Sequence, residues 1–191
     1  KKSSEHYSFK KSVTSNQSYP SSIMGSIALI RQLHHDTNWY KQGNSSNIDL
    51  SIEAIIENKE LPKIFDAGGD KLNTIRAIKL INEIGGDFAV LGSGKEYENL
   101  KELNHQNIKL IIPLDFPKPL NVSDPLLTKQ IPLSSMRYWS QAPSNPAKLA
   151  NLNIPFVFSS TNIKSSKEFF NNLKKAISFG LSHDKALKAL T

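Results

Sequence analysis

Short apolar runs alternate with amphipathic stretches along most of the chain. Four runs are predominantly apolar, and they span residues 61–67, 88–91, 108–114 and 154–158. Continuous apolar runs of this length are typical of parallel strands that are buried on both faces. Between the runs, apolar residues recur every three or four positions, which is typical of helices that bury one side. The pattern predicts an α/β protein built from repeated strand–helix units.

Capping residues and glycines indicate where the helices begin and end. Ser21 or Ser22 can cap the first helix and Asp70 the third, while Gly85 and Gly86 follow the third helix as stop signals. Helices are expected at about residues 21–40, 49–58, 71–84, 95–104, 134–141, 146–152, 165–179 and 182–190.

The number of strands bears on the architecture. Right-handed crossovers between parallel strands make either a doubly wound sheet or part of a barrel. Four strands cannot close a barrel, and alone they would leave two open edges. A closed (β/α)8 barrel takes about 250 residues, whereas this chain has 191. We therefore predict a partial (β/α)8 TIM-type barrel of about four parallel strands with flanking helices, within a larger protein.

The first eighteen residues differ from the rest. They are rich in Ser and Lys, and their apolar residues are only Tyr7, Phe9 and Val13. We expect residues 1–18 to form a flexible or extended lead-in. Residues 19–191 are then expected to form the barrel domain.

Composition narrows the classes of function. The chain is 38% hydrophobic and 21% charged, which suits a packed core. No apolar run approaches the roughly 20 residues that span a bilayer, so no membrane partner is expected. The polar start is no signal peptide, although an exported or periplasmic parent protein is compatible with this segment. The net charge is +7, but the lysines are scattered over predicted helix exteriors, so no nucleic-acid partner is expected. Without cysteine, disulfides and thiol chemistry are excluded.

Candidate site residues follow the predicted strands, because chemistry in parallel α/β folds gathers at the carboxyl ends of the strands. These residues are Asp66, Ser93, Asp115, Ser160 and Thr161, and we expect them to contribute to substrate binding. Asp66 and Asp115 could form an acid–base pair or bind a cation. Alternatively, Asp66 accepts hydrogen bonds from the amides of its own turn, and Asp115 orients the loop that follows it.

The glycine-rich loop after the second run has only a superficial likeness to a phosphate loop. Gly94-Lys95 matches the end of that motif, but Ala89 stands where its first glycine belongs. Glu96 also replaces the Ser or Thr that would hold magnesium. A Walker motif is rejected, and binding of an anion by free amides of the loop stays open.

None of the five histidines follows a predicted strand. His6 lies in the lead-in, His34 and His35 late in the first helix, His105 between a helix and a strand, and His183 at the start of the last helix. They are not expected to converge on a metal.

Trp139 lies in the long loop after the third run, beside Arg137 and Tyr138. It either belongs to a lid over a pocket or pins the loop to the barrel rim.

Three stretches carry a family resemblance. They are residues 19–32 (YPSSIMGSIALIRQ), residues 61–85, and residues 154–191 with their closing helices. In this order they resemble bacterial proteins of the amidohydrolase superfamily, in its imidazolonepropionase-like branch. The resemblance covers residues 19–191 and implies the C-terminal half of that family's barrel.

The resemblance also implies metal ligands that this segment lacks. Intact members bind zinc or another divalent metal through a His-x-His on the first strand, His on the fifth and sixth, and Asp after the eighth, and the metal activates a water. Here Asp66 or its neighbour takes the fifth-strand position, Gly92-Ser93 the sixth, and residues 159–161 (Ser-Ser-Thr) the eighth. Ser and Gly are poor zinc ligands. We therefore expect no metal or other cofactor, and no catalytic residue, in this segment.

Three hypotheses remain. The first is a degenerate, non-catalytic amidohydrolase-like domain with a structural or substrate-binding role. Its partner would be the remainder of its own barrel or a second amidohydrolase domain, and self-association through open sheet edges is another outcome. The alternative is an active hydrolase of C–N bonds, in amides or cyclic amides, that uses Asp66 and Asp115 and is completed by the missing part of the barrel. The third is a doubly wound ligand-binding domain that is complete in itself.

Overall fold

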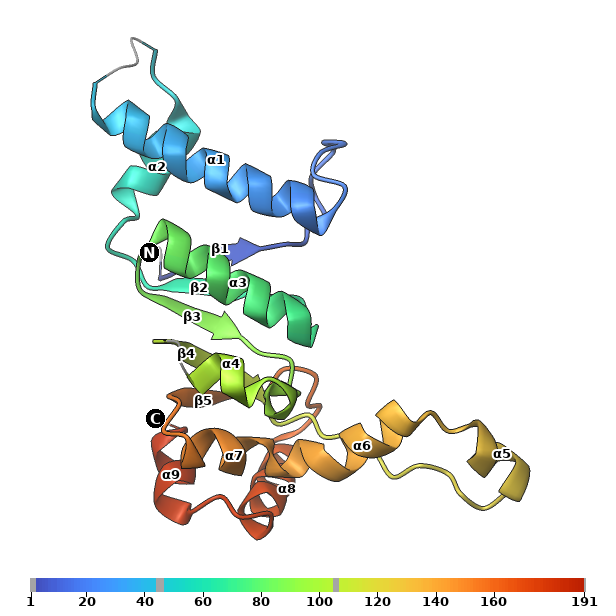
Figure 1. The fold of residues 1–191 in the computed structure, drawn as a ribbon. Helices are drawn as coiled ribbons and strands as arrows, with labels where there is room; N and C mark the ends of the chain where they lie inside the picture. The colour runs from blue at the N-terminus through green and yellow to red at the C-terminus, as the bar shows by residue number, and fades with distance from the viewer. Residues whose placement is uncertain (1–2, 44–46, 105–106, 191) are drawn as a thin grey trace.

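A single sheet of parallel strands organises the chain (Figure 1). The computed structural model describes residues 3–43, 47–104 and 107–190. The strands are β1 (Glu5–Ser8), β2 (Lys63–Asp66), β3 (Phe88–Leu91), β4 (Lys109–Pro113) and β5 (Phe156–Ser159). They lie side by side in sequence order, so every crossover steps in the same direction. This is the order of a barrel wall, and it confirms the predicted α/β partial-barrel fold. The doubly wound alternative, in which the strand order reverses direction, is wrong.

The predicted helices are present with small shifts of their bounds. They are α1 (Ile23–Lys41), α2 (Leu50–Glu57), α3 (Lys71–Ile84), α4 (Leu100–Asn104), α5 (Pro125–Gln130), α6 (Leu133–Gln141), α7 (Asn145–Asn151), α8 (Ser166–Ser178) and α9 (His183–Lys188), with 3₁₀ turns at Glu96–Glu98 and Ala142–Ser144. Ser22 caps α1 by accepting from the Gly25 amide, and Asp70 caps α3. Among the described residues, no helix has the length and apolar character needed to cross a membrane.

One helix was not predicted. Pro125 stands in the first turn of α5, and the Asp124 side chain caps it by accepting from the Leu126 amide. Figure 1 shows α5 and α6 extending away from the sheet as an arm. This arm fills most of the long connection between β4 and α7.

The strand missed from the sequence is β1. The lead-in assigned to residues 1–18 contains Glu5–Ser8, which pairs in parallel with β2, so the sheet has five strands rather than four. Tyr7 lies opposite Phe65 in the register, and Phe9 is buried in the core. His6, which was also placed in the lead-in, is an exposed residue of this strand.

The helices cover one face of the sheet. Alternate strand residues point to that face and are almost completely buried, among them Phe65, Val90 and Ile112. They pack with Ile78 of α3 and Leu103 of α4 in the main core. A second cluster joins α7, α8 and α9 beside the end of β4.

The other face of the sheet is apolar and incompletely covered. Because strand side chains alternate, this face carries Ile64, Ala89, Leu91, Ile111 and Val157, which share register across β2 to β5. Val157 is 43% exposed. In a closed (β/α)8 barrel this face is filled by layers of side chains from all the strands.

Candidate functional site

The five residues predicted from the strand ends lie along the carboxyl edge, but they do not form one cluster. Asp66 ends β2, and its Oδ1 accepts from the Gly68 amide at 2.7 Å, as the structural alternative predicted. Asp115 follows β4, and β3 lies between these two strands. The two carboxylates therefore come from strands that are not neighbours, and their acid–base pairing stays a prediction.

Hydroxyl groups after β5 are likewise engaged locally. The Ser159 and Thr161 hydroxyls lie 2.5 Å apart, and the Thr161 amide donates to Ser159 Oγ at 3.1 Å. Ser160 is exposed and lines a shallow groove with Phe169 and Phe170. The substrate-binding role of these residues stays a prediction.

A buried carboxylate that sequence analysis did not assign to the site organises the loop after β3. Glu96 is 2% exposed, and its Oε1 accepts from the Ser93 amide at 2.5 Å, from the Gly94 amide at 3.0 Å and from the Ser93 hydroxyl at 3.1 Å. Its Oε2 accepts from Nδ2 of Asn145 at 2.7 Å, and Asn145 Oδ1 accepts from the Tyr97 amide at 2.8 Å. Glu96 thus joins the loop after β3 to the start of α7.

This arrangement corrects the interpretation of the glycine-rich loop. The amides of Ser93 and Gly94 are not free for an external anion, because Glu96 occupies both of them. Gly92 leaves room for that carboxylate, since a Cβ at this position would lie 2.6 Å from Oε1. The Ser93 hydroxyl also accepts from the Lys95 amide.

A polar cleft of about 790 Å³ opens beside this loop, and we call it the carboxyl-edge cleft. It lies where the loops after β2 and β3 meet α6 and α7. Its lining carries four cationic side chains and two carboxylates: Lys71, Lys95, Arg137 and Lys148, with Asp70 and Glu98. The lining therefore has an excess of positive charge.

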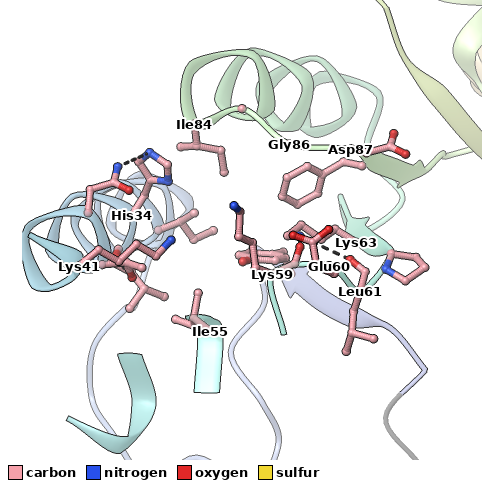
Figure 2. A pocket seen from close by; sticks show the side chains of 18 residues that line it. His34, Lys41, Ile55, Lys59, Glu60, Leu61, Lys63, Ile84, Gly86 and Asp87 are labelled. Carbon is pink, nitrogen blue, oxygen red and sulfur yellow. Dashed lines mark hydrogen bonds between the residues drawn. The ribbon is translucent and has the colours of Figure 1, made fainter. Parts of the chain in front are cut away.

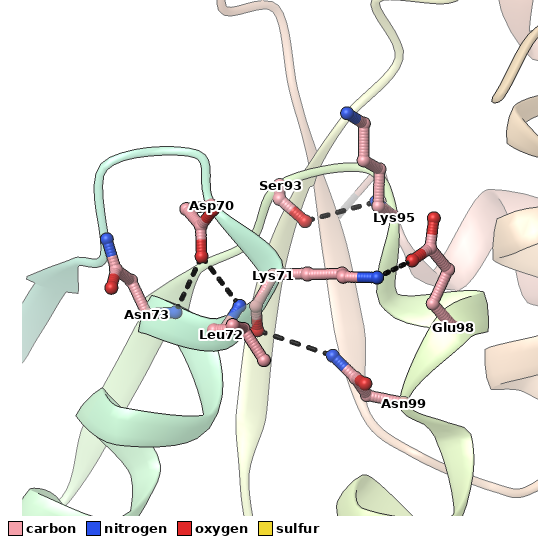
Figure 3. A network of polar contacts seen from close by, with 8 residues as sticks. All are labelled: Asp70, Lys71, Leu72, Asn73, Ser93, Lys95, Glu98 and Asn99. Atoms are coloured by element: carbon pink, nitrogen blue, oxygen red, sulfur yellow. Dashed lines mark hydrogen bonds and ion pairs between the residues drawn. The ribbon is translucent and has the colours of Figure 1, made fainter. Parts of the chain in front are cut away.

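The carboxylates of the cleft are already engaged. Asp70 accepts from the amides of Leu72 and Asn73 at the start of α3, and Lys71 forms an ion pair with Glu98. Figure 3 shows these contacts, with Lys95 directed away from the Lys71–Glu98 pair.

Two tyrosines position the remaining lysines. Lys95 Nζ lies 4.5 Å from the centre of the Tyr138 ring, and Lys148 Nζ lies 5.1 Å from that of Tyr97. Such cation–π contacts hold the ammonium groups at the cleft wall. Burial, followed by the charge of Glu98, raises the pKa of Tyr97 to about 12, so this hydroxyl stays protonated at neutral pH.

Tyr138, the neighbour of Trp139, lies beside the loop after β3. A Cβ built on Gly94 would lie 3.7 Å from the Tyr138 hydroxyl, and burial, with the charges of Asp115 and Glu96, raises the pKa of Tyr138. Trp139 is 40% exposed. The sequence signal was the aromatic pair itself, but it did not show which ring faces inward.

The expected absence of a metal at the carboxyl edge stays a prediction, and the donors present there bear on it. At the three strand ends where the resemblance implies metal ligands, Asp66 accepts from its own turn, and the other two positions carry glycine or hydroxyl groups. In residues 3–43, 47–104 and 107–190, no three His, Asp or Glu side chains gather as a metal site would need. His34 and His35 lie on α1, His183 begins α9, and His105 lies outside the described residues.

Comparison with known proteins supports the fold. No family model matches the chain, and no curated protein matches it. A crystal structure described as an amidohydrolase from Thermotoga maritima MSB8 is similar, with a TM-score of 0.63 and 20% sequence identity. The match covers 90% of this chain and 44% of that one. The chain thus has the fold of part of that amidohydrolase and spans less than half of its length.

Proposed function

We propose that this chain is a non-catalytic, amidohydrolase-like barrel segment that binds a small polyanion in the carboxyl-edge cleft. The shared fold supports the amidohydrolase relationship, and the resemblance of residues 19–32, 61–85 and 154–191 supports the imidazolonepropionase-like branch. The observation that carries the proposal is the contrast at the carboxyl edge. Asp66, Ser159 and Thr161 are bonded within their own turns, whereas the lining of the adjacent cleft has an excess of positive charge.

A larger barrel is the setting that suits the sheet. β1 and β5 are the outer strands of the described sheet, and the apolar face that includes Ile111 and Val157 is incompletely covered. Further strands, from the same polypeptide or from a second amidohydrolase-like domain, would pair with these edges and bury that face. In this setting the segment contributes part of the barrel wall and one binding cleft.

The first prediction concerns metals. Titration of the chain with ZnCl2 or MnCl2, followed by calorimetry, should give no saturable binding at the carboxyl edge, because no three His, Asp or Glu side chains of the described residues gather there. Asp66→Ala should leave the titration unchanged. Stoichiometric binding that Asp66→Ala removes would overturn the non-catalytic proposal and favour the alternative, an active hydrolase.

The second prediction concerns anions. Citrate should bind saturably and more weakly at high salt, and Arg137→Met should lower its affinity about tenfold, because a guanidinium pairs with a carboxylate through two hydrogen bonds. The matched control is Lys174→Met, which removes one exposed charge from α8, outside the cleft lining. Equal losses for the two variants would show that citrate responds to net charge alone and would contradict a cleft-specific site.

A further inference from the structure

A second pocket lies at the opposite edge of the sheet, near the strand starts, and we call it the amino-edge pocket. It has a volume of about 560 Å³ and lies between α1 from Ile30 onward, α2 and the first residues of β2 and β3. This volume is typical of a small-molecule site. The pocket is separate from the carboxyl-edge cleft, and its role does not depend on the proposed function.

The inner walls of the pocket are apolar. Ile30 and Leu33 come from α1, Ile55 from α2, Ile84 from the end of α3, and Phe88 from the start of β3. Phe88 is almost fully buried and the four aliphatic side chains are half-buried, so a ligand here would displace water from apolar surface.

Lysines form the rim. Lys63 is already engaged, because its Nζ donates to the Lys59 carbonyl at 2.7 Å and lies 3.9 Å from Glu5. Lys59 is exposed, and among the described residues its ammonium has no acceptor. Figure 2 shows the Lys59 side chain extending into the open space that faces His34 and Ile84.

Other charged and titratable side chains also line the pocket. Asp87 points to the surface, where it pairs with Lys109 at 2.7 Å, and Glu60 and Lys41 are exposed at the rim. His34 receives a hydrogen bond from Asn38, and burial, with the charges of His35 and Lys41, lowers its pKa. The ring of His34 is therefore neutral at pH 7.

We propose that the amino-edge pocket binds a small amphipathic carboxylate, whose apolar body packs against α1 and α3 while its carboxylate pairs with Lys59. An uncharged apolar ligand would desolvate the ammonium without offering it an acceptor, which costs free energy. A small anion without an apolar part would leave the apolar side chains of the pocket exposed to water. A carboxylate that is joined to an alkyl chain or a ring can pack against the apolar walls and pair with Lys59 at the same time.

Octanoate is the probe that tests this proposal. With the isoleucine δ-methyl groups labelled for NMR, titration should shift Ile30, Ile55 and Ile84 saturably, and it should leave Ile64 and Ile111 of the uncovered sheet face unshifted. Octan-1-ol should bind about tenfold more weakly, and acetate should not bind, because each supplies only one half of the interaction.

Variants of Lys59 distinguish the effect of its positive charge on octanoate binding from the effect of its side-chain length. Lys59→Met should weaken octanoate binding about tenfold, whereas Lys59→Arg should keep it, and Lys79→Met, an exposed lysine of α3, is the matched control. The proposal is overturned if Lys59→Met binds octanoate as the parent does, if octan-1-ol binds equally well, or if the shifts map to Ile64 and Ile111. None of these results bears on citrate binding in the carboxyl-edge cleft.

Discussion

Replacing Glu96 with alanine should lower the free energy of unfolding by about 3–5 kcal/mol. The reason is that three donors lose their acceptor together: the half-buried amide of Ser93, the buried amide of Gly94 and the buried side-chain amide of Asn145. Each unsatisfied buried donor costs about 1–3 kcal/mol, and water that enters the vacated space offsets part of the sum. Urea unfolding followed by tryptophan fluorescence measures the loss.

Glu98→Ala is the matched control for this variant. Glu98 lies two residues along the same turn, and its carboxylate forms a surface ion pair with Lys71, which is worth about 0–1 kcal/mol. Glu96→Gln should fall between the two, because one oxygen remains for the loop amides while its new amide group faces the Asn145 amide. Equal destabilisation by Glu96→Ala and Glu98→Ala would refute the buried role of Glu96.

Much of the fold could be predicted because its signals are local. The strands β2 to β5 coincide with continuous apolar runs, and Ser22, Asp70 and Gly85 lie where caps and stop signals place them. These features depend on neighbours within a few residues. The strand order confirmed the predicted partial barrel, which the crossovers alone had left open beside a doubly wound sheet.

The strand β1 could not be predicted in the same way. Its four residues, Glu5–Ser8, are mostly polar, and only Tyr7 and the following Phe9 signal burial. What makes the segment a strand is its pairing with β2, which lies more than fifty residues away in the sequence. A strand of four mostly polar residues carries too weak an apolar signal to be recognised from the sequence alone.

In the candidate site, too, local contacts could be predicted from the sequence and long-range contacts could not. The hydrogen bond from the Gly68 amide to Asp66 spans two residues, and it was one of the two roles that the sequence suggested for Asp66. The contact of Glu96 with Asn145, and the placement of Lys148 over Tyr97, join segments about fifty residues apart and have no local signal. Cationic residues that are scattered in the sequence meet in the carboxyl-edge cleft only because α6 and α7 return to the loop after β3.

Phe65→Ala should cost about 3–5 kcal/mol and should release β1 from the sheet. Phe65 is fully buried, and its ring centre lies 4.9 Å from that of Phe9 and 6.3 Å from that of Tyr7, so it holds both aromatic anchors of β1. The cavity left by the ring removes contacts that backbone pairing of four residues cannot replace, because short strand pairs are marginal without a packed face. Amide hydrogen exchange should then show loss of protection in β1 before β3 or β4.

Phe170→Ala, at a ring that is 53% exposed on α8, should cost far less. If Phe65→Ala lowers stability while the β1 amides keep their protection, the aromatic cluster does not hold this strand in place.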